Sequence, residues 1–249
     1  MPLTAVFRGL PMLRVGLTVA LMALALAPLS GHAADVAIFG GGEVQGHGQS
    51  YSFLGADVTQ PFTESLAFGV RLIPHYLTYK YRSGGDLIEA EALGVDLAVG
   101  LKLTLGTTYA SLLAGIRARD TDLTPDVRDD DARGETIGPL VMGEFGTTLP
   151  SRTSISYFGS FGGADDFLYQ KLTVKQQVTN LDYSGRNTIH VGGELFGGRN
   201  DDFSMIGAGP VVELYHIPYA LAIAIKGGYR YDTTFGDGFY AGLFFYKGF

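Results

Sequence analysis

Bulky apolar residues alternate with small or charged residues along most of the chain after residue 34. In the segment 87–102, one phase of this alternation carries bulky apolar side chains from residue 93 onward: Leu93, Val95, Leu97, Val99 and Leu101. Successive side chains of a β-strand point to opposite faces of its sheet, so the pattern predicts a strand with one apolar face. The segments 107–119, 203–215 and 219–231 repeat it.

The length of these segments separates two kinds of β-protein. Strands with one apolar face occur in soluble sandwiches and in membrane barrels alike. Soluble strands average about 5–6 residues, whereas a tilted strand needs about 9–11 residues to cross a bilayer. Because the alternating segments reach the longer value, the sequence favours an all-β fold, an antiparallel transmembrane up-and-down β-barrel of about 12 strands. A soluble periplasmic β-sandwich is the alternative.

Turn residues divide the chain into the strands that this barrel requires. We place them at 35–45, 49–60, 64–80, 86–104, 107–119, 135–148, 152–162, 167–178, 187–197, 202–215, 218–232 and 238–249. Short connections alternate with Gly- and Asp-rich ones, of which Asp120–Gly134 is the longest. Outer-membrane barrels have short periplasmic turns and longer external loops, so we expect the first strand to begin in the periplasm.

Residues 1–33 have the pattern of a signal peptide, which leaves 34–249 as the expected barrel domain. Arg8 and Arg14 precede an apolar run from Val15 to Pro28, and small residues surround Ala33. The run fits the core of a signal peptide, about 7–15 residues, and is shorter than the roughly 20 residues of a spanning helix. An uncleaved anchor is the alternative. Export to the bacterial outer membrane is therefore expected.

Composition excludes several classes of function. The chain has 18 Lys and Arg against 25 Asp and Glu, a net charge of −7, so it lacks the basic footprint of a nucleic-acid-binding protein. It has no Cys, and hence no disulfide, thiolate metal site or Cys nucleophile. Asp129–Asp131 lack the spacing of an EF-hand loop, and we interpret them as a solvated loop. No cofactor or metal is predicted.

Eleven charged residues fall on the phase opposite the apolar one and are predicted to face the barrel interior. They are Asp96, Lys102, Arg117, Arg119, Glu144, Lys171, Lys175, Glu194, Glu213, Lys226 and Arg230. Opposite charges at similar depth can cross-link a small barrel, so the mixed signs favour a filled or narrow lumen over an open pore.

His190 and Glu194 are candidate catalytic residues, because they lie on one face of the same expected strand. They could act as a base and the acid that orients it. No serine can be placed beside them from the sequence, so we interpret them as a polar pair in the lumen. His47 and His75 are placed near loops and His216 in a turn. No catalytic residue is predicted.

Short motifs follow one another in the C-terminal part of the chain. Gly192-Gly193-Glu194 precedes Gly197-Gly198-Arg199-Asn200-Asp201-Asp202-Phe203, and Gly227-Gly228-Tyr229-Arg230 precedes Gly238-Phe239-Tyr240. Their order over residues 190–249 resembles the BcsS family of cellulose biosynthesis proteins, although Gly193 stands where that family has Pro. The terminal Phe249 resembles the last residue of outer-membrane barrels, and Lys247 departs from their usual ending.

The resemblance implies a non-enzymatic outer-membrane β-barrel that supports cellulose or exopolysaccharide biosynthesis or export. It implies the cellulose synthase machinery or the exported polysaccharide as partners, in addition to outer-membrane lipid. A small passive channel unrelated to polysaccharide and a rim-site lipid hydrolase are the alternatives.

An epitope tag inserted after Asp130 is expected to bind antibody on intact cells without loss of the folded barrel. The segment Asp120–Gly134 has only Leu123 and Val127 to bury, and loops tolerate insertion where few contacts depend on their backbone. Immunolabelling before and after permeabilisation of the outer membrane measures this. If the tag is labelled only after permeabilisation, the predicted orientation of the barrel in the membrane is inverted, and so is the direction of every strand.

Overall fold

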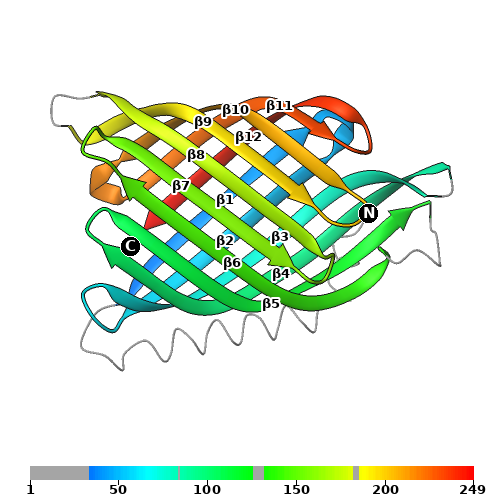
Figure 1. Ribbon diagram of the computed structural model, residues 1–249, viewed down its shortest axis with the longest axis horizontal. Coiled ribbons are helices and arrows are strands. Elements are labelled where there is room, and N and C mark those ends of the chain that lie inside the picture. The colour runs from blue at the N-terminus through cyan, green and yellow to red at the C-terminus, as the bar shows by residue number, and fades with distance from the viewer. Residues whose placement is uncertain (1–33, 84, 126–131, 182–184) are drawn as a thin grey trace, which may run out of the picture.

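The computed structural model describes residues 34–249, except for 84, 126–131 and 182–184. These residues form twelve antiparallel strands that close into one barrel (Figure 1). The strands are β1 (Asp35–Gln45), β2 (Ser50–Pro61), β3 (Leu66–Ser83), β4 (Asp86–Leu105), β5 (Thr108–Thr124), β6 (Gly134–Thr148), β7 (Thr153–Gly162), β8 (Phe167–Asn180), β9 (Asn187–Arg199), β10 (Ser204–His216), β11 (Leu221–Asp232) and β12 (Gly236–Gly248). The expected signal peptide lies outside the described residues.

Each strand pairs with its neighbours in the chain, and β1 pairs with β12 to close the barrel. Ala37 lies opposite Gly248 in this last pair, and the Phe249 N–H donates a hydrogen bond of 2.9 Å to the Val36 carbonyl. Closure leaves no free sheet edge, whose backbone N–H and C=O groups would find no water to bind in the hydrocarbon of a bilayer. The predicted up-and-down topology is confirmed. Each expected strand is found within three residues of its predicted bounds, except that β5 ends five residues later than expected.

The connections fall into the two predicted sets, one at each end of the barrel. In Figure 1 the short connections and the C-terminus lie at the left-hand end, and the other connections lie at the right-hand end. We call these the short-turn end and the loop end. Two 3-10 turns, η3 (Gly46–Gly48) and η4 (Ile217–Tyr219), belong to the connections. No helix of the described residues is long and apolar enough to cross a membrane.

The segment Asp120–Gly134 is shorter as a loop than we expected. Strand β5 continues to Thr124, so Asp120 and Asp122 belong to the strand and point outward. The ladder between β4 and β5 continues in regular register through Arg119 and Thr121, as far as Thr124 opposite Glu89. The site chosen for the epitope tag, Asp130, lies outside the described residues.

The predicted phases of the strands are confirmed by burial. On β4, Ala92, Asp96 and Ala98 are buried, whereas Leu93 and Val99 between and beyond them are exposed. On β5, Leu112 is 64% exposed and the adjacent Leu113 only 5%. One face of the sheet is thus apolar and outward, as the lipid side of a membrane barrel must be.

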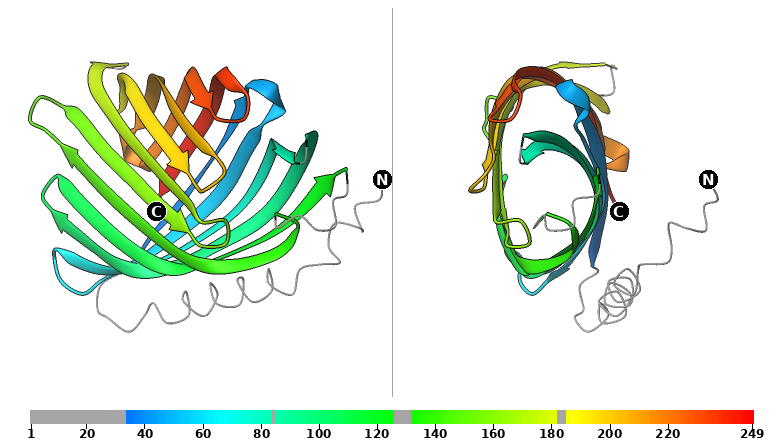
Figure 2. Two further views of the ribbon diagram at one scale, coloured as in Figure 1. Left: turned by 45° about the vertical axis from the view of Figure 1, so that its right-hand side comes forward. Right: turned by 90° about the vertical axis from the view of Figure 1, so that its right-hand side faces the viewer.

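The barrel is oval in cross-section, as the end-on view in Figure 2 shows. An apolar cluster fills part of its interior: Ile73, Ala98, Leu113, Leu140 and Met142 are buried, and Phe39 and Phe53 pack against them. These residues come from β1 to β6. Side chains from both sides of the barrel therefore meet in this part of the lumen, while the rest stays open.

Leu97→Arg is expected to lower the free energy of unfolding by about 2–4 kcal/mol, because it places a charge on the lipid face. The matched variant Ser156→Arg places the same side chain on β7, where Ser156 lines the lumen. It is expected to change the free energy by less than about 1 kcal/mol. Reversible unfolding in lipid vesicles measures both values. Equal losses would mean that the outward and inward phases are misassigned.

Candidate functional site

The barrel encloses a cavity of about 2090 Å³. Asp35, Tyr219 and Phe249 line it at the short-turn end, and Arg82, Asp202 and Thr234 line it at the loop end. The cavity therefore extends along the barrel between its two ends. It is the candidate functional site, and its chemistry is set by the inward side chains.

All eleven charged residues that the sequence placed inside line this cavity: Asp96, Lys102, Arg117, Arg119, Glu144, Lys171, Lys175, Glu194, Glu213, Lys226 and Arg230. The structure joins most of them into separate ion-pair clusters. Each cluster joins side chains from different strands. The alternation shows which side chains face the lumen, but it does not show which of them pair.

Arg71 forms the first cluster. Its Nε and Nη2 donate hydrogen bonds of 2.7 Å to the two carboxylate oxygens of Asp57, on the neighbouring strand β2. Its Nη1 and Nη2 donate bonds of 2.6 and 3.1 Å to Glu144, on β6. The Ser111 hydroxyl also donates to Glu144, at 3.2 Å. Two bidentate pairs on one guanidinium fix its position, so Arg71 braces β3 against β6.

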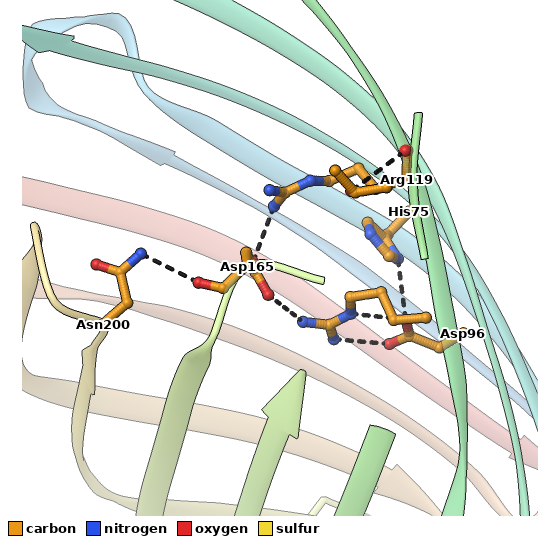
Figure 3. A network of polar contacts seen from close by, with 7 residues as sticks. His75, Asp96, Arg119, Asp165 and Asn200 are labelled. Atoms are coloured by element: carbon orange, nitrogen blue, oxygen red, sulfur yellow. Dashed lines mark hydrogen bonds and ion pairs between the residues drawn. The ribbon is translucent and has the colours of Figure 1, made fainter. Parts of the chain in front are cut away.

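Asp96 and Arg117 form the centre of the second cluster, shown in Figure 3. Arg117 donates two hydrogen bonds of 2.8 Å to the carboxylate of Asp96, which is 2% exposed. His75 lies 4.0 Å from the same carboxylate, too far for a hydrogen bond. A Cβ on Gly94 would lie 2.2 Å from the His75 ring, so only glycine leaves room for that ring. His75 is thus buried in the middle of β3, and its predicted place near a loop is wrong.

Asp165 completes this cluster from the turn between β7 and β8. Its carboxylate accepts a hydrogen bond of 2.8 Å from Arg119 and lies 3.7 Å from Arg117. The Gly163 N–H donates to the Pro139 carbonyl at 2.7 Å, and a Cβ on Gly138 would lie 2.3 Å from the Ala164 nitrogen. The turn therefore folds inward over Gly138 and carries Asp165 into the loop end of the cavity (Figure 3).

Lys226 forms the third cluster with two acids. Its Nζ donates to Glu43 at 2.7 Å and lies 3.2 Å from Glu194. The Tyr240 hydroxyl donates to the same Glu194 oxygen at 3.0 Å. Glu194 is 6% exposed, and its charge is compensated by this lysine and hydroxyl.

Glu213 holds the fourth cluster. Lys175 donates to it at 2.6 Å, and His190 Nδ1 lies 3.1 Å from its other oxygen. The suggested pairing of His190 with Glu194 is wrong, because Glu213 lies directly opposite His190 on the next strand. Among the described residues, no serine hydroxyl hydrogen-bonds to His190, so this pair has no nucleophile beside it. His216 ends β10 and contacts Asn187 at 2.6 Å.

Several inward charges were not among the predicted set. Glu43, Asp57 and Arg71 lie on strands, and their phase could have revealed them, because each alternates with outward residues in its segment. Asp165 lies in a turn, and no sequence pattern shows that a turn folds into a barrel. Within the described residues no group of three or more His, Asp or Glu is arranged to hold a metal ion.

The family model for cellulose biosynthesis protein BcsS matches residues 30–249. This chain belongs to the BcsS family. The match extends well beyond residues 190–249, where the sequence motifs resembled the family, and covers every strand of the barrel. No curated protein matches the chain.

Solved structures that resemble this BcsS chain are outer-membrane barrels. The translocator domain of autotransporter NalP from Neisseria meningitidis is 12% identical, with a TM-score of 0.50, over 94% of this chain and 97% of that one. The beta domain of the Bordetella autotransporter Brka is 14% identical, with a TM-score of 0.46, over 86% and 97%. At these identities the likeness to NalP supports the barrel fold alone.

Asp165→Asn is expected to raise the ion conductance of the barrel in planar bilayers. It removes the charge that holds the inward turn to Arg117 and Arg119, and hydrogen bonds to charged groups contribute about 1.5–3 kcal/mol. Asp166→Asn removes the same charge from the next residue and is the matched control. Equal conductance of the two variants would show that the Asp165 ion pairs do not hold the turn.

Proposed function

We propose that this BcsS chain is a non-enzymatic outer-membrane barrel that supports bacterial cellulose biosynthesis or export. The family match over residues 30–249 carries the proposal. The barrel fold supports a place in the outer membrane, where the short-turn end would face the periplasm. Residues 1–33 would direct the chain there as a signal peptide.

The chemistry of the lumen supports a role without catalysis. The described histidines have no hydroxyl nucleophile hydrogen-bonded to them, and the carboxylates of Asp96, Glu213 and Glu194 are bound to arginine, lysine or tyrosine. A general base must reach the proton that it abstracts, and here the acids are engaged in bracing strands. Expected partners are outer-membrane lipid and, at the periplasmic end, the cellulose synthase machinery or the polymer itself.

An in-frame deletion of the gene is expected to reduce cellulose-dye binding of colonies toward the level of a strain without cellulose synthase. Expression of the full chain from a plasmid should restore it, and transcript levels of neighbouring genes serve as the control for polar effects. Outer-membrane fractionation of the restored strain checks the location. Unchanged dye binding in the deletion strain would exclude a role in cellulose production.

A passive channel is the second candidate, because residues at both ends of the barrel line one continuous cavity. It would be independent of cellulose. Uptake of small neutral solutes by vesicles that contain the barrel, together with normal cellulose in the deletion strain, would favour it.

A further inference from the structure

Aromatic rings line the cavity in two ladders. In the first ladder, the Phe53 ring centre lies 6.2 Å from Phe39, 5.5 Å from Tyr51 and 6.4 Å from Phe244. In the second, Tyr169 lies 6.2 Å from Phe158 and 6.4 Å from Phe196. These are ordinary separations for packed aromatic side chains. All of these rings line the cavity.

The two ladders stand on opposite sides of the barrel. The first is centred on β2 and the second on β8, which are six strands apart around the closed sheet. Phe39 lies toward the short-turn end of β1, whereas Tyr51 is the second residue of β2 at the loop end. The first ladder therefore runs along the lumen, with the second ladder facing it.

Most of these rings are only partly buried. Phe39, Tyr51, Phe53, Phe158 and Tyr169 each keep an intermediate exposed fraction. Rings that served only to fill a core would be buried on all sides, as Ile88 and Leu140 are at 1% exposed. The ladders thus present apolar ring surface to the cavity.

The charges between the ladders are balanced. Asp96 and Asp165 face Arg117 and Arg119, and Glu213 faces Lys175. Asp57 and Glu144 bind Arg71, and Lys102 lines the same small recess. These carboxylates are thus paired with opposite charges, whereas rings of one sign form the selectivity filters of many ion channels.

Lys171 adds a free hydrogen-bond donor to this neutral lumen. It lies on β8 between Tyr169 and Thr173, within electrostatic range of Lys226 and of the acids Glu194 and Glu43. It makes no hydrogen bond or ion pair with another described residue. An ammonium group has three donors, so Lys171 can bind an oxygen of a molecule in the cavity without leaving a partner unpaired.

We propose that the lumen is a binding site for an extended, uncharged glycan chain. This inference rests on the proposed function and names the molecule that the barrel holds. A β-linked hexopyranose chain has flat C–H faces, which pack on aromatic rings, and equatorial hydroxyls at its edges. The ladders would contact the faces, and Lys171 and the lumen carboxylates would contact the hydroxyls. A few polar groups among apolar ones are typical of small-molecule sites.

Isothermal titration of the purified barrel in detergent with cellohexaose tests the inference. We expect binding of cellohexaose and none of an oligogalacturonate of equal length, because the acidic and basic side chains of the lining nearly balance and give a polyanion no strong attraction. Phe158→Leu should weaken cellohexaose binding about two- to tenfold, the loss of one aromatic contact. Phe161→Leu, on the outer face of the same strand and 38% exposed, is the matched control and should bind as the wild type does.

Heat-modifiable mobility on gels shows whether each variant is folded before it is titrated. Absence of cellohexaose binding to the folded wild-type barrel would overturn the inference, as would equal binding of oligogalacturonate or equal weakening by Phe158→Leu and Phe161→Leu. The proposed function fails separately, if deletion of the gene leaves cellulose unchanged. Binding together with normal cellulose would support the glycan site and contradict the role in cellulose production.

Discussion

The structure depends on one constraint, that backbone N–H and C=O groups inside a bilayer must find partners within the protein. The chain meets it by pairing β1 with β12. Once the sheet is closed, the alternation of side chains assigns one phase to lipid and the other to the lumen. The closure of the sheet by the β1–β12 pair therefore gives the barrel an apolar exterior and a charged interior.

Closure also determines how the interior charges are stabilised. Ion pairs such as Arg71 with Glu144 link strands that are not adjacent, and Lys226 of β11 reaches Glu43 of β1. A buried charge is costly when it lacks a partner. Pairing within each cluster offsets this cost and braces the oval barrel across its width. The lumen consequently carries many charges on its walls and is nevertheless close to neutral along its length.

The inward turn between β7 and β8 gives the loop end a different character from the short-turn end. Asp165 lies between two arginines, and Asn200 of the next turn donates to its carbonyl at 3.2 Å. Two turns are thus tied to each other and to the barrel wall. A lumen that has aromatic ladders, and an inward turn fixed by ion pairs, is suited to accommodating a molecule.

The sequence by itself determined the twelve strands, their phases and the position of the eleven predicted lumen charges, because period-two alternation is a local property of each strand. It could not determine partners. The contacts of Glu194 with Lys226 and Tyr240 join strands far apart in the chain, and the sequence suggested His190 instead. The inward course of Gly163–Asp166 and the burial of His75 were likewise decided only by the tertiary structure. Both depend on space left by a glycine on another strand, Gly138 and Gly94, which no local pattern of residues records.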